Sequence, residues 1–406
     1  MIPVHEAKTI IKSFLNGTGS EIVNLDKAGG RILYECINAD FPMPRFDNSA
    51  MDGFAVKAID TMGASKENPL TLKMVGASYA GKPFEGSIQS GECTQCMTGA
   101  MIPKGADAIV IVEQSSGFSD KEMVQIYSQT RKGNHIRIQG EEVKENTLLI
   151  EKGKNISAGE LGILAAFGFG EVNVARRPAV ALFSTGNELV EPGKSLAKGQ
   201  IYNSNMFVLG DMIKSAGGKI VLQDVISDDK SSLKTFITSA LNQADIIISS
   251  GGISMGRGDY VRSVLIESGV QEHFWKVNQK PGKPLFFGTA DTSLIFGLPG
   301  NPVSSFICFQ EYIDPVIREI QQETPLPPMK ATLTDTFSVE KSKHRFRFGK
   351  YWINLNGKIM CSAFPHDGSH MLTSSLDANC ILEAPPGEFD LVPGDEITMK
   401  RINWRN

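Results

Sequence analysis

Short apolar runs separated by helix-forming segments dominate the middle of this chain, and this alternation limits the folds open to it. Four of the runs predict strands that are buried on both faces: Ala179–Phe183, Ile220–Leu222, Asp245–Ser249 and Ser293–Phe296. Between the first two, the segment from Ser204 to Ala216 predicts a helix, because a Gly-Gly pair follows it as a stop signal. Strands that alternate with helices predict a doubly wound α/β sheet with right-handed connections.

The sequence on either side of this α/β domain predicts further domains, and a chain of 406 residues has room for them. From Cys36 to Ile150, short strand-like segments are divided by Gly, Pro and Asn, which indicates a mostly β unit. A stiff proline-rich linker at 324–328 precedes Lys330–Asn406, whose strand-length segments and turn signals predict a small β module. The sequence thus predicts a multidomain α/β protein.

Each strand of the α/β domain is followed by a loop rich in Gly or in polar side chains. The loops are Ser184–Glu188, Ser227–Asp229, Ser249–Asp259 and Gly297–Pro302. Ligands of open α/β sheets bind beyond the carboxyl ends of the strands, so these loops are expected to meet at one rim. They would bring backbone N–H groups and several carboxylates together, which predicts a phosphate-bearing ligand held with a divalent cation.

The glycine loop after Ser249 differs from the commoner phosphate-binding motifs. It is not a Walker A loop, because Arg257 and Gly258 stand where Lys and Ser/Thr are needed. It also lacks the third glycine of a dinucleotide fingerprint. Ser254 does fit the Gly-x-Ser-x-Gly pattern of a hydrolase nucleophile, but Asp259 and His273 lie too near it in sequence to come from separate strand ends. Covalent catalysis is therefore the weaker interpretation.

Three carboxylates on the predicted rim are the candidate metal ligands: Glu188, Asp228 and Asp259. Their hard oxygen atoms suit Mg²⁺, and no cluster of His or Cys points to zinc. Asp228 has an alternative role, because an Asp just before a helix often caps it.

Three lysines lie in or beside a loop stiffened by two prolines: Lys276, Lys280 and Lys283. Clustered cations near acids predict a small oxyanion or phosphate partner, with an ordinary solvated face as the alternative.

Charge and hydropathy exclude several classes of protein. The net charge of −4 argues against a large basic face for nucleic acid. The most apolar stretch, Leu161–Gly170, is far too short to cross a membrane, and the charged N-terminal segment is unlike a signal peptide. Cys93 and Cys96 form a Cys-x-x-Cys pair, which indicates either a redox site or two incidental thiols on a strand. The chain is expected to be cytoplasmic.

Six motifs, in order along essentially the whole chain, resemble the MoeA family of molybdopterin molybdenumtransferases, to which the E domain of gephyrin also belongs. The motifs are Phe46–Phe54, Thr98–Ala100, Ser184–Glu188, Ser249–Gly256, Lys280–Pro284 and Gly297–Ser304. The resemblance implies a homodimer of elongated, four-part subunits with shared active sites. It also implies an enzyme that transfers molybdate into adenylylated molybdopterin and releases AMP in a Mg²⁺-dependent step.

The resemblance implies four domains in each subunit. They are an extended linking and dimerisation domain made of 1–26 and 143–177, a β-rich domain of 27–142, the α/β molybdopterin-binding domain of 178–326, and a C-terminal β-barrel-like domain of 327–406. Transient contacts with the adenylyltransferase that makes the intermediate and with molybdoenzyme apoproteins are expected as well.

The family's functional positions transfer to residues of this sequence motif by motif. The acids Glu188, Asp228 and Asp259 resemble the family's functional carboxylates, which are expected to surround Mg²⁺. Lys280, Lys283 and Ser304 resemble the positions that hold molybdate, and Lys276 joins the basic wall. Further substrate-binding residues on the ligand loops are Ser250, Gly251, Gly252, Pro299, Gly300, Asn301, Pro302 and, in the C-terminal domain, Ser369.

Three more catalytic positions are implied in the β-rich domain, where the family's residues face the rim of the other subunit: Asp52, Thr98 and Glu142. The sequence departs from the family pattern at Glu142, where Asp is familiar, and at Asn187, which replaces a frequent Asp. The spacing of Arg345 and Arg347 is also compressed.

Two alternative functions remain beside molybdenum insertion. The α/β domain could itself adenylylate molybdopterin, as its relatives do. A non-enzymatic scaffold like gephyrin is the other alternative, although no partner domain or long interaction linker is attached.

Overall fold

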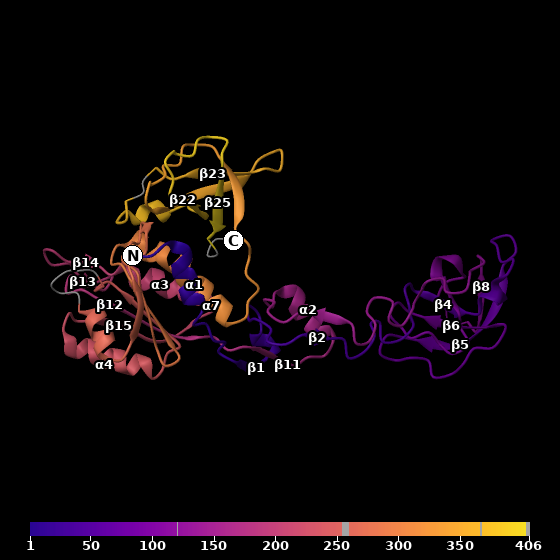
Figure 1. Ribbon diagram of the computed structural model, residues 1–406. Coiled ribbons are helices and arrows are strands. Elements are labelled where there is room, and N and C mark those ends of the chain that lie inside the picture. The colour runs from indigo at the N-terminus through magenta and orange to yellow at the C-terminus, as the bar shows by residue number, and fades with distance from the viewer. Residues whose placement is uncertain (120, 254–259, 366–367, 403–406) are drawn as a thin grey trace. The chain divides into compact units, whose positions relative to one another are not determined.

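The computed structural model describes residues 1–119, 121–253, 260–365 and 368–402, and the chain forms two compact units (Figure 1). The first unit comprises Met1–Glu35, Lys152–Leu161 and Gly170–Asn406, and the second comprises Cys36–Glu151 and Gly162–Phe169. Each unit has its own sheets and its own hydrophobic core.

A six-stranded sheet in the order β15-β12-β16-β20-β19-β17 forms the centre of the first unit. Four neighbouring strands are parallel: β15 (Lys219–Ile226), β12 (Ala179–Thr185), β16 (Ile246–Ser250) and β20 (Ser293–Leu298). These are the four apolar runs of the sequence, so the parallel strands are confirmed. Two further strands extend the sheet: β19 (Phe286–Ala290) pairs antiparallel with β20, and β17 (Gln271–Trp275) pairs antiparallel with β19.

Helices cover both faces of this sheet because its central strands are apolar on both sides. Val180 and Leu182 of β12 belong to one core cluster, whereas Ala181 and Phe183 belong to the other, as the two-residue repeat of a strand requires. The first face packs against α1 (Val4–Lys12), α3 (Ser204–Ser215), α6 (Pro302–Cys308), the π-helical turn η4 (Phe309–Ile313) and α7 (Asp314–Ile320). The second face packs against α4 (Lys230–Leu241) and α5 (Val261–Glu267).

The C-terminal strands of the first unit close into a small barrel. Five strands pair in the order β22-β23-β21-β25-β24, and β24 pairs again with β22. They are β21 (Met329–Leu333), β22 (His344–Ile353), β23 (Ile359–Ala363), β24 (Cys380–Ala384) and β25 (Glu396–Arg401). Strand β18 (Gln279–Lys280) adds to this barrel by pairing with the start of β22. It opens the loop that carries Lys280 and Lys283, called the lysine loop below. Closure leaves the barrel without the free edges of an open sheet.

The second unit is built on a five-stranded sheet in the order β7-β4-β6-β5-β8, drawn in indigo and violet in Figure 1. Its strands are β4 (Gly53–Val56), β5 (Leu70–Ser78), β6 (Glu92–Cys96), β7 (Ala108–Ile111) and β8 (Met123–Ile126). Two shorter pairs accompany it, β2 (Ile37–Asn38) with β10 (Leu148–Ile150) and β3 (Asn48–Ser49) with β9 (Ile136–Arg137).

The two cysteines of the Cys-x-x-Cys pair lie on β6 and are fully buried. Burial raises the pKa of Cys93 to about 12 and that of Cys96 to about 11, so both are thiols at neutral pH. These properties are those of two core residues and oppose a redox role.

The remaining elements link the larger parts of the chain. Strand β1 (Ser20–Asn24) pairs with β11 (Glu171–Ala175) in the first unit. Helix α2 (Ala158–Ala166) begins with the capping box that Ser157 and Glu160 predict, because the Ser157 N–H donates to Glu160 Oε2 at 2.9 Å. Across the parts of the chain that the structure describes, no helix combines the length and the apolar character needed to span a membrane. The multidomain α/β class is thus confirmed, while the four domain boundaries stay a prediction.

Candidate functional site

A pocket of about 1130 Å³ lies in the first unit, at the carboxyl ends of the parallel strands. Most of the rim residues that the sequence predicts line it. They are Glu188, Asp228, Ser250, Gly251, Gly252, Lys280, Lys283, Pro299, Gly300, Asn301, Pro302, Ser304 and Ser369. Residues from both the α/β domain and the C-terminal barrel region therefore share one cavity.

Two glycine-containing loops meet on one wall of this pocket. The backbone of Gly251 and Gly252 has φ values of +90° and +70°, a conformation that glycine adopts without strain. Asn205 on α3 ties this loop to the next, because its Nδ2 donates to Ser250 Oγ and to the Gly300 carbonyl, both at 2.8 Å. The Gly251 N–H donates to the Leu298 carbonyl at 3.0 Å, so it stabilises the loop and is not available to a ligand.

The loop after β20 also contacts a segment beyond the linker. Asn301 Nδ2 donates to Ser369 Oγ at 3.1 Å, and the Val303 N–H donates to the Ser369 carbonyl at 3.2 Å. The sequence offered no local signal for this contact, because 68 residues separate Asn301 from Ser369.

The structure separates the roles of two neighbouring carboxylates. Asp229 is the N-cap of α4, since its Oδ1 accepts from the Ser232 N–H at 2.8 Å. That hydrogen bond holds the pKa of the Asp229 carboxyl below its ordinary value. Asp228 instead lines the pocket and accepts from the Asn187 N–H at 3.1 Å. The alternative role of Asp228 as the helix cap is therefore wrong.

Glu188 and Asp228 are the described carboxylates that could hold a divalent cation in the pocket. Glu188 folds back over Gly186, where an added Cβ would lie only 2.8 Å from both carboxylate oxygens. No group of three potential metal ligands occurs among the residues that the structure describes, and Asp259, the third predicted ligand, lies outside them. Two carboxylates suit Mg²⁺, which usually takes one or two from the protein and completes its shell with water and phosphate oxygens.

The lysine loop contributes two ammonium groups to the pocket, those of Lys280 and Lys283. Lys280 Nζ lies 2.6 Å from Glu340 Oε1, which also accepts from Arg345 Nη1 at 3.1 Å. The hydrogen bond from Lys280 lowers the pKa of the Glu340 carboxyl. Lys276 is not among the lining residues, and its Nζ lies 3.8 Å from the centre of the Trp275 ring.

Comparison with known proteins identifies the family. Family models for the MoeA N-terminal region (domain I and II), a probable molybdopterin binding domain and the MoeA C-terminal region (domain IV) match residues 2–168, 181–319 and 330–401. A Haemophilus influenzae protein named molybdopterin molybdenumtransferase is 35% identical over 391 residues, which is 95% of each chain. The chain belongs to the MoeA family.

Other members of the MoeA family agree over the full length. The Bacillus subtilis molybdopterin molybdenumtransferase is 32% identical over 410 residues, which cover 100% of this chain and 95% of that protein. The crystal structure of the molybdopterin biosynthesis MoeA protein from Pyrococcus horikoshii superposes with a TM-score of 0.84 at 33% identity, covering 99% of both chains.

The second unit of this MoeA-family chain contains the other three predicted catalytic residues. Asp52 and Thr98 are in direct contact, because Asp52 Oδ1 accepts from both the N–H and the hydroxyl of Thr98 at 2.7 Å. The backbone hydrogen bond, followed by the hydroxyl, lowers the pKa of Asp52. Glu142 is exposed, and its N–H donates to the Met43 carbonyl at 3.1 Å.

Some residues of this MoeA-family pocket were not predicted from the sequence. Gln279, Asn205, Lys343 and His370 line it as well. Asn205 sits in the first turn of a helix, where Asn usually indicates only a cap, and Gln279 carries no signal beyond its place before the lysine loop. The two arginines with compressed spacing do not line the pocket: Arg345 contacts Glu340, and Arg347 Nη2 donates to the Phe364 carbonyl.

Proposed function

We propose that this chain inserts molybdenum into molybdopterin, taking adenylylated molybdopterin and molybdate as substrates and releasing AMP. The observation that carries the proposal is the pocket itself. In a chain related to molybdopterin molybdenumtransferases over its whole length, glycine loops, two carboxylates and two lysines line one cavity. Separate parts of this cavity suit the phosphates, a cation and an oxyanion.

The phosphate groups of the adenylylated substrate fit best against the two glycine loops. Among the described residues, the backbone N–H groups of Gly252 and Gly300 have no intramolecular acceptor, so they can donate to phosphate oxygens. Asn205 holds these two loops together and thereby fixes the spacing of the donors. Rigid donors cost little reorganisation when charge develops on the phosphates.

Glu188 and Asp228 would hold Mg²⁺ beside the phosphates, with Asp259 as a third predicted ligand. The chemistry that the ion supplies when bound is neutralisation of the charge on the phosphate oxygens and on the departing AMP. The protein's part is to place both carboxylates in the pocket without a cationic side chain paired to them. Neither forms an ion pair with another described residue, and Asp228 uses only Oδ2 to accept from the Asn187 N–H, so each carboxylate keeps at least one oxygen for the cation.

Molybdate fits the part of the pocket that Lys280, Lys283 and Ser304 line. Lys280 and Lys283 supply positive charge, and the buried hydroxyl of Ser304 supplies a hydrogen-bond donor. Lysines bind such an oxyanion as point charges, so their placement decides how well they bind it.

The direct test is AMP release from adenylylated molybdopterin by the purified protein. We expect release that depends on molybdate and on Mg²⁺, and that Lys280→Ala and Lys283→Ala weaken its dependence on molybdate. Release of AMP at the same rate without molybdate would contradict the proposal. Pyrophosphate release from ATP and molybdopterin without molybdate would instead identify an adenylyltransferase.

The family resemblance supports a homodimer whose active site combines residues of both subunits, with Asp52 and Thr98 facing the partner's rim. Because Asp52 Oδ1 accepts from both the N–H and the hydroxyl of Thr98, the two residues would enter the partner's site together. The protein is proposed to act in the cytoplasm, consistent with six cysteines that are all free thiols. Transient contacts with the adenylyltransferase and with molybdoenzyme apoproteins complete the proposal.

Subunit mixing tests the shared site. We expect Asp52→Ala and Glu188→Ala each to be inactive alone. When subunits exchange, a heterodimer has one site with both lesions and one with neither, so each heterodimer should recover at most about half of the parent activity by two-fold symmetry. Persistent inactivity, with exchange shown by mass spectrometry, would put Asp52 and Glu188 in the site of a single chain.

A further inference from the structure

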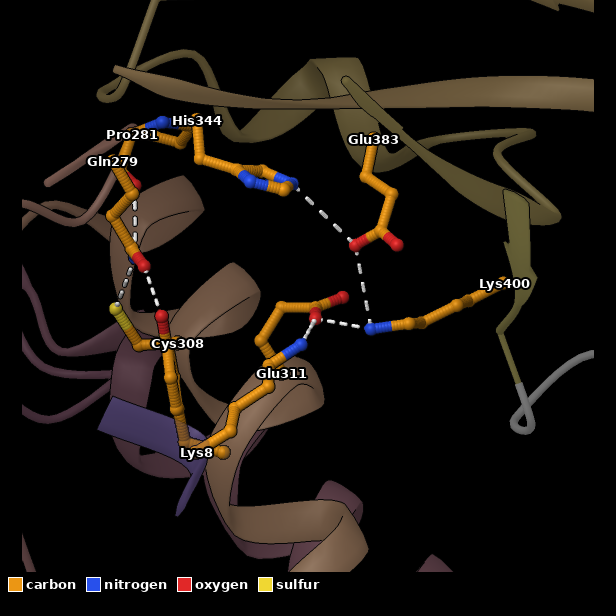
Figure 2. Close-up of polar contacts among 9 residues, drawn as sticks. Lys8, Gln279, Pro281, Cys308, Glu311, His344, Glu383 and Lys400 are labelled. Atoms are coloured by element: carbon orange, nitrogen blue, oxygen red, sulfur yellow. Dashed lines mark hydrogen bonds and ion pairs between the residues drawn. The ribbon is translucent and has the colours of Figure 1, made fainter. Parts of the chain in front are cut away.

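A buried polar network lies behind the loop that carries Lys280 and Lys283 (Figure 2). Its members are Gln279 on β18, Cys308 on α6 and Tyr312 in η4, and their exposed fractions are 1%, 0% and 2%. Polar groups this deeply buried need hydrogen-bond partners, because water cannot supply them. The partners of Gln279 include the backbone of the lysine loop.

The side-chain amide of Gln279 spans the inside of the loop. Its Nε2 donates to the Pro281 carbonyl at 3.1 Å and to the Gly282 carbonyl at 3.2 Å, and it lies 3.5 Å from Cys308 Sγ. Its Oε1 accepts from the Tyr312 hydroxyl. The chemistry dictates this orientation, since a rotated amide would turn Oε1 toward two carbonyl oxygens that cannot donate.

The loop packs too closely on this network to shift without disturbing it. Gly282 has φ of +87°, and a Cβ there would lie 2.5 Å from Cys308 Sγ and 2.7 Å from Gln279 Nε2. Cys308 Sγ also lies 3.5 Å from the Gly282 carbonyl. The peptide groups of Pro281 and Gly282, which come between the two lysines, thus rest directly on Gln279 and Cys308.

Backbone pairing holds the ends of the same loop. Gln279 and Lys280 pair with His344 and Arg345 of β22, and the Val277 N–H donates to the Lys283 carbonyl at 3.0 Å. With both ends held, the conformation of the middle depends on the two carbonyl groups that Gln279 binds.

From these contacts we infer that Gln279 is a positioning residue for the lysine loop, and that Tyr312 orients the side-chain amide of Gln279. The inference rests on the proposed function, in which Lys280 and Lys283 hold molybdate. Without the amide donors, the Pro281 carbonyl loses its partner and the Gly282 carbonyl keeps only the weak donor Cys308 Sγ. The peptide planes between the lysines then turn, and the ammonium groups move. A small displacement of binding groups from their productive geometry is costly for binding and rate.

The test measures KM for molybdate and KM for adenylylated molybdopterin separately in the AMP-release assay. Tyr312→Phe keeps the ring and removes the hydroxyl that orients Gln279. We expect it to raise the molybdate KM about three- to tenfold, the size of effect that losing one neutral hydrogen bond produces. The KM for adenylylated molybdopterin should change little. The melting temperature should fall by no more than a few degrees, because one buried acceptor, Gln279 Oε1, loses its donor.

Tyr127→Phe is the matched control. Tyr127 also donates its hydroxyl to a Gln Oε1, that of Gln125 at 3.2 Å, but in the second unit. This variant should leave both KM values unchanged.

Gln279→Glu adds a pH signature that a merely structural role would not produce. The new carboxyl has nearly the size of the amide, and it can donate a hydrogen bond to a loop carbonyl only while protonated. Burial raises the pKa of such a group, so a part of the population stays protonated at mildly acidic pH. The molybdate KM of this variant should therefore rise more steeply from pH 6 to pH 8 than that of the parent protein.

The outcomes separate this inference from the proposed function. If Lys283→Ala raises the molybdate KM while Tyr312→Phe and Gln279→Glu do not, the positioning role is wrong and the proposed function stands. Equal increases in both KM values, with a lower melting temperature, would also overturn it as general destabilisation. If Lys280→Ala and Lys283→Ala leave the molybdate KM unchanged, the lysine loop does not bind molybdate, and both that part of the proposed function and this inference are wrong. Should Gln279→Glu fail to fold, Tyr312→Phe alone decides.

Discussion

Two adjacent carboxylates, Asp228 and Asp229, show how finely function is divided at the scale of single residues. The side chain of Asp229 closes the first turn of α4, while that of Asp228 faces the pocket. Sequence alone left capping open as an alternative role for Asp228, beside its predicted role as a Mg²⁺ ligand, because an Asp-Asp pair before a helix does not reveal which residue is the N-cap. The distinction depends on the backbone: Asp229 has the extended φ and ψ of an N-cap, −127° and 143°.

Substitutions at these two positions should have separate consequences. Asp229→Ala removes the cap, and we expect the melting temperature to fall by roughly 2–4 °C with catalysis nearly intact. Asp228→Asn should leave the melting temperature unchanged and raise the Mg²⁺ concentration needed for AMP release, because an amide is a poorer ligand for a hard cation. Thermal melts and Mg²⁺ titrations check both. A lower melting temperature for Asp228→Asn, together with an altered Mg²⁺ requirement for Asp229→Ala, would reverse the roles of the two carboxylates.

Glu340 is a second residue whose charge matters to the pocket. Its carboxylate lies 2.6 Å from Lys280 Nζ, so it competes with an incoming oxyanion for that ammonium group and also repels it. Glu340→Gln should lower the molybdate KM about three- to tenfold, since a nearby charge pair of this kind is worth about one factor of ten. The exposed Glu388 of the same barrel region provides the control Glu388→Gln. A higher KM would mean that Glu340 serves mainly to orient Lys280.

At the scale of elements, the sequence predicted what depends on local pattern. The four parallel strands were predictable because each is a continuous apolar run, and the capping box at Ser157 gave the start of α2. The reversed direction of β19, which is antiparallel to both β20 and β17, was not, because an apolar run does not encode strand direction. The pairing of β18 with β22 also escaped prediction, since it joins residues about 65 positions apart, Gln279 with His344.

At the candidate site, too, the sequence predicted what local pattern determines and missed what depends on contacts across the fold. Glycine loops, acids and lysines were predictable as types of residue at strand ends, and the structure brings most of them into one pocket. Gln279 and Asn205 were not, because their importance depends on which backbone groups they reach across the fold. Lys276 lies beside Trp275 because its backbone turns there, with φ of 81°.

The glycine loop itself allows a test at this scale. A Cβ on Gly252 would lie 2.4 Å from Val261 Cγ2 and 2.6 Å from Thr185 Oγ1, and φ is +70°. Gly252→Ala should therefore destabilise the protein by about 2–4 kcal/mol, from backbone strain and overpacking together. Gly193→Ala, at a similarly positive φ with open space around the Cβ, should cost about 1 kcal/mol. Denaturant unfolding measures both, and equal losses would show that the packing around Gly252 is loose.

At the scale of the first unit as a whole, a buried charge network connects three parts of the chain (Figure 2). Glu311 of η4, whose side chain is fully buried, pairs with Lys8 of α1 at 2.5 Å and with Lys400 of β25. Lys400 also lies 3.5 Å from Glu383 of β24, which lies 3.7 Å from His344 Nε2. The N-terminal helix, the α/β domain and the barrel thus share one set of charges. Removing one partner of a buried ion pair lowers the stability of the fold strongly, because the remaining charge stays buried without compensation.

Glu383 makes this network sensitive to pH. Burial by itself would raise the pKa of the Glu383 carboxyl, but His344 and the ammonium groups of Lys400 and Lys8 outweigh it and lower the pKa to about 2. Because the folded-state pKa lies below that of the unfolded chain, about 4.3, the ionised carboxylate stabilises the fold above about pH 4.5. This contribution is lost as the pH falls through the range from about 4.5 to about 2.

Glu383→Gln should therefore reduce the free energy of unfolding by on the order of 3 kcal/mol at pH 6, and by progressively less as the pH is lowered below about 4.5. Urea unfolding of parent and variant at pH 6, 4.5 and 3.5 measures that difference directly. Glu396→Gln, an exposed position on strand β25 of the same barrel, should match the parent at every pH and controls for loss of a negative charge alone. A difference that grows in acid, or one that Glu396→Gln reproduces, would show that the network does not hold Glu383 ionised.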